Sequence, residues 1–116
     1  MLLFCYPKCS TCKKVQKWLD EKNIKHEYRD IKSDNPKYDE LKKWIKKSGL
    51  PIRKFFNTNG LVYKEMGLKD KLQSMSEDEQ IKLLATDGML VKRPLVISND
   101  FVLVGFREEE WINTLM

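Results

Sequence analysis

Two cysteines lie between a short apolar run and an amphipathic segment near the start of the chain. Residues 1–6 fit a buried strand, and Cys9-Ser10-Thr11-Cys12 follows soon after it. The segment Ser10–Glu21 then predicts a helix, because its apolar residues recur at helical spacing among lysines. Residues 26–31 predict a second strand. This strand–helix–strand order predicts an α/β protein with its cysteines at the first strand–helix turn.

The middle of the chain, residues 33–88, is predicted to be a mostly helical insertion. Asn35-Pro36 is expected to open its first helix, with a side-chain cap followed by a proline in the first turn. Ser76 and Glu79 have the spacing of a capping box and predict the start of a later helix. Asp87-Gly88 is expected to end that helix.

Strand character returns near the end of the chain. Residues 95–97 and 101–104 flank Ser98-Asn99-Asp100, which predicts a tight hairpin. Because a hairpin is antiparallel, the four-stranded sheet is expected to be mixed. A closing helix is predicted over residues 108–115, with three residues on its buried side: Trp111, Ile112 and Leu115. The expected order is βαβ, a helical insertion and ββα, in one domain of 116 residues.

Composition excludes several classes of protein. Hydrophobic residues make up 41% and charged residues 34% of the chain, which is typical of a globular protein. No apolar run approaches the roughly 20 residues that a membrane helix needs, and the apolar start is too short for a secretory signal. We therefore expect a soluble, cytoplasmic monomer. The net charge of +5 comes from lysines interleaved with acids, which favours solvated helix faces over an acidic partner, and no motif indicates direct nucleic-acid binding.

The spacing of Cys9 and Cys12 indicates thiol redox chemistry. A thiol is nucleophilic only as the thiolate, and the unpaired N–H groups at a helix start stabilise a thiolate. Cys9, at the exposed start of the helix, is therefore the expected nucleophile. Cys12 lies about one turn inside the helix, close enough to resolve a mixed disulfide. Lys8, Lys13 and Lys14 add positive potential near the pair.

Other interpretations of these residues stay open. A zinc site needs about four ligands, whereas the chain offers three cysteines and one histidine that is remote in sequence, so no metal is expected. Two inert buried cysteines are a further alternative. Cys5 is expected to be a core residue of the first strand, with a role as third redox partner as the alternative. His26 is expected on the surface or at a strand edge.

Five separate segments form an ordered set along nearly the whole chain. They are the cysteine turn at residues 9–13, Arg53 before an apolar turn, Met66-Gly67-Leu68, Arg93-Pro94-Leu95-Val96 and Gly105-Phe106-Arg107. Together they resemble the arsenate reductase (ArsC)-like family, which also includes the Spx transcriptional regulators. Residues 54–60 and 84–94 are most similar to a branch of small bacterial proteins, named as arsenate-reductase-family or Spx/MgsR-type proteins, whose activity is mostly unassigned.

The resemblance implies a thioredoxin-like fold with a helical insertion, in which Pro94 is cis and faces the cysteines. It implies that Cys9 is the nucleophile and that three of the four arginines hold an oxyanion: Arg53, Arg93 and Arg107. A guanidinium suits this role because it stays charged and presents paired donors. The remaining arginine, Arg29, is expected to be structural.

The cysteine turn departs from the arsenate reductases at three positions. Cys12 stands where they have serine, and Lys13 stands where they have arginine. Cys5 stands where they have the histidine that tunes the thiolate. A pair such as Cys9 and Cys12 is instead what the Spx regulators have, where it works as a disulfide switch.

Two functions are therefore predicted. The first is a thiol-dependent reductase in which Cys9 attacks an arsenate-like oxyanion or a disulfide and Cys12 resolves the intermediate. It would hold no bound cofactor and would take electrons from glutathione with glutaredoxin, or from thioredoxin. The alternative is an Spx-like redox-switched regulator that binds RNA polymerase through the C-terminal domain of its alpha subunit.

Overall fold

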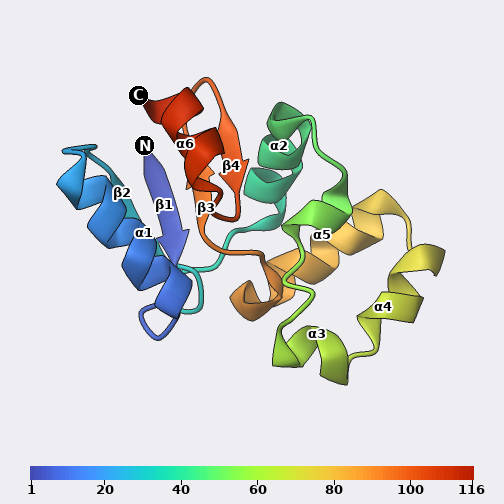
Figure 1. Cartoon of the computed structure of the whole chain (residues 1–116). Coiled ribbons are helices and arrows are strands. Elements are labelled where there is room, and N and C mark those ends of the chain that lie inside the picture. Colours follow the sequence, from blue (N-terminus) through green and yellow to red (C-terminus); the bar gives the residue numbers. More distant parts are fainter.

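Four short strands form one mixed sheet in the computed structural model, which describes residues 1–116. The spatial order is β2-β1-β3-β4 (Figure 1). β1 pairs in parallel with β2, whereas β1 with β3 and β3 with β4 pair antiparallel, which confirms the predicted mixed sheet. The strands are β1 (Leu2–Cys5), β2 (Glu27–Asp30), β3 (Leu95–Ile97) and β4 (Val102–Val104).

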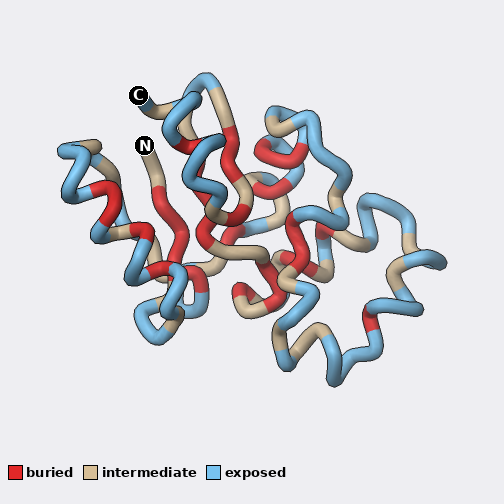
Figure 2. Tube along the Cα trace, viewed as in Figure 1, coloured by how far each residue is buried: buried red, intermediate tan, exposed pale blue.

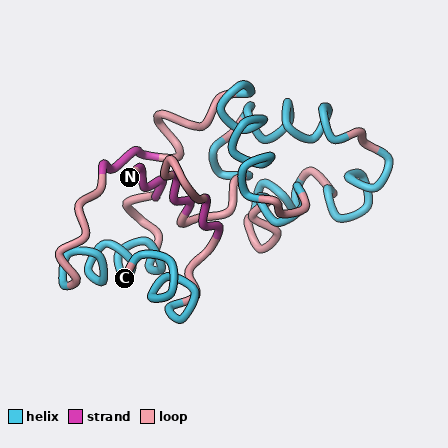
Figure 3. The backbone as a smooth tube through the Cα atoms, turned by 90° about the horizontal axis from the view of Figure 1, so that it is seen from above, coloured by secondary structure: helices cyan, strands magenta, loops and turns pink.

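Helices lie on both sides of the sheet (Figure 3). α1 (Ser10–Glu21) and α6 (Glu108–Leu115) pack on one face, and the insertion lies on the other. None of the helices has the length and apolar character needed to cross a membrane. The insertion contains α2 (Tyr38–Ser48), α3 (Leu61–Glu65), α4 (Leu68–Lys71) and α5 (Glu77–Thr86), with 3₁₀ turns at Ile52–Phe55, Leu72–Ser74 and Gly88–Leu90.

Side chains of β1 alternate between two cores, because successive residues of a strand point to opposite faces of a sheet. Phe4 packs with the insertion, whereas Leu3 and Cys5 pack beneath α1 and α6. Figure 2 shows β1 and the inner side of α1 as buried segments. The core beneath α1 and α6 consists of Leu3, Cys5, Cys12, Val15, Trp18, Leu19, Val96, Leu103 and Trp111. The fold therefore brings Cys5 and Cys12 into the same core.

The Ser76 capping box is confirmed. The Ser76 hydroxyl accepts a hydrogen bond from the Glu79 N–H at 3.1 Å, and the Ser76 N–H donates to Glu79 Oε1 at 2.9 Å. These two bonds satisfy backbone donors at the start of α5 that would otherwise have no partner.

Replacing Ser76 with alanine should therefore lower the free energy of unfolding by about 1 kcal/mol, because one N–H of α5 loses its acceptor. Chemical denaturation of both proteins measures the difference. Ser33→Ala is the matched control, since Ser33 is also exposed and its hydroxyl makes no hydrogen bond in the structure. An equal loss in both variants would contradict a specific role for the cap.

Two local expectations are wrong. Asn35 does not cap α2, which begins at Tyr38; its side-chain amide instead donates to the Ala85 carbonyl at 2.7 Å, near the end of α5. The start of α2 is satisfied by Glu40, whose Oε1 accepts from the Lys37 N–H at 3.0 Å. Ile112 is 42% exposed although its neighbour Trp111 is fully buried, because the short α6 presents only a narrow face to the sheet.

The insertion is fastened to the chain that leads into β3. Phe56 and Val91 form an antiparallel bridge, in which the Lys92 N–H donates to the Phe55 carbonyl at 2.7 Å. The neighbouring Asn57 N–H donates to the Leu90 carbonyl, also at 2.7 Å. Only Lys92 therefore lies between the Phe56–Val91 bridge and Arg93, which precedes β3.

Candidate active site

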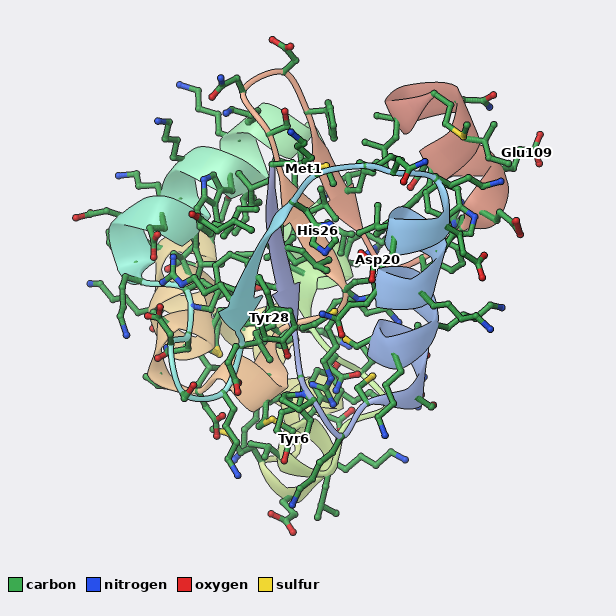
Figure 4. The ribbon with its side chains drawn as sticks, turned by 90° about the vertical axis from the view of Figure 1, so that its left-hand side faces the viewer. Met1, Tyr6, Asp20, His26, Tyr28 and Glu109 are labelled. Atoms are coloured by element: carbon green, nitrogen blue, oxygen red, sulfur yellow. The ribbon has the colours of Figure 1, made fainter.

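The cysteine turn connects the end of β1 to the start of α1. In Figure 4, Tyr6 lies beyond the end of β1, at the opposite end of that strand from Met1. The Cys9 N–H donates to the Tyr6 carbonyl at 2.9 Å, which closes the turn, and the Cys9 carbonyl accepts from the Lys13 N–H at 3.1 Å. Cys9 is therefore the N-cap residue of α1 and is half-buried, whereas Cys12 in the first turn is only 1% exposed.

Three thiols meet at this turn. The Cys12 sulfur accepts a hydrogen bond from the Tyr6 N–H at 3.4 Å. Cys5 packs with Cys12 in the core beneath α1, and Cys9 contacts that core from its edge. The neighbouring Cys5 thiol is the largest of the effects that lower the pKa of Cys12 to about 6, followed by the bond from Tyr6, while burial opposes them.

Cys5 shows the opposite behaviour. The neighbouring Cys12 thiol and complete burial both raise the pKa of the Cys5 thiol above the ordinary value. The protonated form of Cys5 is therefore favoured. The Tyr6 N–H and the neighbouring Cys5 thiol therefore favour the thiolate form of Cys12.

The Cys12 thiol should ionise as the pH rises through about 6. The ultraviolet absorbance of thiolates measures this step in the reduced protein, and the step should vanish in Cys12→Ser. Because the ordinary pKa is 9.0 and the folded value is lower, the ionisation also stabilises the fold as the pH rises from about 6 towards 9. Cys5→Ala should move the step to higher pH, and an unchanged step in Cys12→Ser would refute the assignment.

Arg93 adds positive charge beside the thiols. Its charge is among the effects that lower the pKa of Cys12, and its guanidinium carbon lies 5.6 Å from the centre of the Tyr6 ring. Two of its nitrogens, Nε and Nη1, are buried and have no hydrogen-bond partner. Buried donors of a charged group are rarely left unpaired, since this costs free energy. Arg93 therefore has two unpaired nitrogens in the neighbourhood of Cys12.

Arg53 and Arg107 lie on a cavity of about 710 Å³ beside the insertion. Both are exposed, and Arg107 is the N-cap residue of α6. Lys54 and Lys92 line the same cavity, against one acid, Glu110. None of these four cations forms an ion pair within the chain. The cavity walls include neither cysteine of the pair nor Arg93, so the arginines fall into two places: one beside the thiols and two in the cavity.

Pro94 connects these two places. The Arg93–Pro94 peptide bond is cis, and Pro94 is buried directly before β3. The Pro94 carbonyl accepts a hydrogen bond from the Gly105 N–H at 2.9 Å. Gly105, the partner of Pro94 in this hydrogen bond, lines the cavity, and so does Lys92, two residues before Pro94. Arg93 lies between Lys92 and Pro94, so it directly adjoins a residue of the cavity wall.

The other candidate residues lie elsewhere. His26 is half-buried, makes its hydrogen bond with the Ile24 carbonyl, and in Figure 4 lies well away from Tyr6 towards Met1. Arg29 binds both carboxylate oxygens of Glu40, at 2.7 and 2.9 Å, and stacks on Phe4. Arg29 thus joins β2 to α2. No group of three or more histidine, cysteine or acidic side chains is placed to hold a metal ion.

Two residues of the site were missed by the sequence analysis. Tyr6 supplies the N–H that binds Cys12 and the ring that faces Arg93. Lys92 lines the cationic cavity. The position of Tyr6 between the first strand and the cysteines was a usable signal, because a residue there must share the turn with them. Lys92 offered none, since lysines occur along the whole chain.

Two solved structures share this fold over nearly the whole chain. An ArsC family related protein from Bacteroides fragilis is 60% identical, with a TM-score of 0.94 over 97% of this chain and 94% of the other. A possible arsenate reductase from Streptococcus mutans UA159 is 41% identical, with a TM-score of 0.87 over 96% of each chain. The sheet with its helical insertion is therefore the thioredoxin-like fold of these proteins.

Sequence relatives agree with the structures. The uncharacterised protein YusI of Bacillus subtilis is 49% identical over 111 residues, which cover 96% of this chain and 94% of YusI. The global transcriptional regulator Spx of Staphylococcus aureus is 26% identical over 93% of this chain and 81% of Spx. The model of the ArsC family matches residues 4–114. This chain, with Cys9 and Cys12 at the start of α1 and a cis proline before β3, is a member of the ArsC family.

Proposed function

We propose that this protein is a thiol-dependent reductase in which Cys9 attacks the substrate and Cys12 resolves the intermediate. The observation that carries the proposal is the pair of buried, unpartnered Arg93 donors beside the thiol cluster. An anion held there would satisfy both donors and would lie next to the nucleophile. Cys9 is the attacking thiol because it is half-buried, whereas a substrate cannot reach the fully buried Cys12.

The chemistry follows from the positions of Cys9 and Cys12, which lie at the N-cap and in the first turn of α1. The Cys12 thiolate takes the proton of Cys9 as Cys9 attacks. With arsenate, a sulfur–arsenic bond forms, and one hydroxyl of arsenate takes the proton from Cys12 and leaves as water, which returns Cys12 to the thiolate. Cys12 then attacks the Cys9 sulfur, the sulfur–arsenic bond breaks with its electron pair going to arsenic, and arsenite leaves. With a disulfide substrate, Cys9 displaces one thiolate and Cys12 the other. Both routes end in a Cys9–Cys12 disulfide, which an external thiol must reduce.

The cationic cavity would hold the rest of an anionic substrate or reductant. Arg53 and Arg107, with Lys54 and Lys92, offer four cations that have no partner in the chain. Glutathione carries two carboxylates and fits such a surface. Lys92 in the cavity is followed directly by Arg93, so a ligand bound in the cavity contacts the residue next to the arginine beside the thiols.

Arsenate-dependent oxidation of NADPH tests the proposal. The assay is coupled once to glutathione, glutaredoxin and glutathione reductase, and once to thioredoxin and thioredoxin reductase. We expect turnover with at least one system. Turnover of Cys12→Ser with glutathione but not with thioredoxin would identify Cys12 as the resolving thiol. No turnover with either system would rule out arsenate, and reduction of a glutathione mixed disulfide would then test the other substrate class.

The second candidate is a redox-switched regulator. The observation that favours it is the likeness to Spx over 93% of the chain, together with the Cys9–Cys12 spacing. In this case, oxidation of the pair would change a surface that binds the C-terminal domain of the RNA polymerase alpha subunit. Pull-down with that domain in reducing and oxidising buffer separates the candidates, because a reductase does not need to bind it in either state.

A further inference from the structure

We propose that Cys5 is a third redox-active thiol, which receives the disulfide from Cys9 and forms a buried Cys5–Cys12 disulfide. The inference deepens the proposed function and rests on it, because the exchange begins from the Cys9–Cys12 disulfide. Cys5, the last residue of β1, would then take part in the redox chemistry in addition to packing in the core. The protein would then have two successive oxidised states.

The placement of the three sulfurs supports this exchange. Cys9 is the N-cap residue of α1 and Cys12 lies in its first turn, and the thiols of Cys5 and Cys9 are both among the groups that lower the pKa of Cys12. Its sulfur is 3.4 Å from the backbone nitrogen of Tyr6, the residue that follows Cys5 in the chain. Cys5 and Cys12 are 0% and 1% exposed, and they pack in the same core beneath α1. Cys9 contacts that core from its edge and remains half-buried.

The exchange balances without any further oxidant. The Cys5 thiol loses its proton and attacks the Cys12 sulfur of the Cys9–Cys12 disulfide. A Cys5–Cys12 bond forms, the Cys9–Cys12 bond breaks, and Cys9 leaves as a thiolate that takes up a proton. The number of disulfides stays at one, and the oxidised site moves from the half-buried sulfur to two buried ones.

The burial of each sulfur sets the order and the consequences of the steps. Cys5 is fully buried and protonated, so its attack should be slower than the formation of the Cys9–Cys12 disulfide. After the exchange, Cys9 is again a free thiol at the start of α1 and can react with a second molecule of substrate. The Cys5–Cys12 disulfide is inaccessible to an external reductant until the exchange reverses. The protein would therefore keep a buried Cys5–Cys12 disulfide while the Cys9 thiol is free to react.

Tryptic mapping distinguishes the two disulfides because of the positions of the lysines. Cleavage after Lys8 and Lys13 gives one peptide with Cys5, residues 1–8, and one with both Cys9 and Cys12, residues 9–13. A Cys9–Cys12 disulfide stays within the second peptide and lowers its mass by two hydrogens. A Cys5–Cys12 disulfide links the two peptides. The full-length protein is oxidised with glutathione disulfide, quenched in acid at increasing times, and alkylated in denaturant before digestion.

We expect the internal disulfide first and the linked peptides later, with Cys9 alkylated and Cys5 protected. Cys9→Ser should form neither disulfide, because the exchange starts from Cys9 and the other two thiols are at most 1% exposed. Cys5→Ala should stop at the internal disulfide. If peptide 9–13 of the wild type holds the disulfide while Cys5 stays alkylated at all times, the relay is wrong and the proposed function stands. If Cys9 and Cys12 both stay alkylated, the resolving step fails, and the relay fails with it.

Discussion

Replacing Cys9 with serine should lower reductase turnover by about 10³-fold or more, to the uncatalysed level. A serine hydroxyl is a far weaker nucleophile than a thiol, and no other sulfur of the site can replace it. Cys5 and Cys12 are at most 1% exposed, so neither can be reached by a substrate. Turnover with the coupled reductant that supports the wild type measures the loss.

Ser10→Ala is the matched control for this substitution. Ser10 is the exposed neighbour of Cys9 at the start of α1, and its hydroxyl makes no hydrogen bond in the structure. The control should keep turnover within about threefold, a difference below 1 kcal/mol in the barrier. Cys9→Ser with turnover equal to that of the control would exclude Cys9 as the nucleophile. An intact fold, seen as unchanged circular dichroism, is required for both comparisons.

Replacing Gly88 with alanine should lower the free energy of unfolding by about 3 kcal/mol. Gly88 lies where the insertion returns to the sheet, and a β-carbon there would overlap the backbone carbonyl of Ile31. A backbone group cannot rotate away as a side chain does, so the two segments must separate. The Asn35–Ala85 hydrogen bond joins the same segments and would be strained as well. Urea denaturation gives the change in free energy.

Gly49→Ala separates this close approach from the general cost of losing a glycine. Gly49 ends α2 with a φ of 69°, and nothing lies within 4 Å of an added β-carbon. The cost there should be about 1 kcal/mol, from backbone conformation alone. Equal losses in the two variants would mean that the contact with Ile31 relaxes without cost.

Local signals predicted most of the fold. The capping pair Ser76 and Glu79 lies three residues apart and binds its own backbone, so the start of α5 could be predicted without tertiary contacts. The bounds of α1 and α6 followed from helical spacing for the same reason. Asn35 misled because its side chain has a choice of acceptors, and the one that it binds, at Ala85, is 50 residues away. Ile112 misled because three apolar neighbours on a short helix cannot all face the sheet.

The site was predictable in its parts but not in its arrangement. The resemblance pointed to Cys9, Arg93 and Pro94 as neighbours, and they occupy the turn and the strand entry that meet at one end of the sheet. It grouped Arg53 and Arg107 with them, whereas the structure places those two in the adjoining cavity. The influence of Cys5 on Cys12 depends on how α1 packs over β1. The sequence separation of Cys5 and Cys12 does not show how close their two sulfur atoms lie in the fold.

The Phe56–Val91 bridge also determines how the molecule can move. Only Lys92 separates the bridge from Arg93, and the Lys92 N–H is itself held by Phe55. The insertion and the thiol site are therefore mechanically coupled: a shift of Ile52–Phe55 must either break these hydrogen bonds or displace Arg93 with it. A partner that binds the outer surface of the insertion and shifts it would therefore move Lys92 and Arg93, and so change the position of the Arg93 charge relative to Cys12.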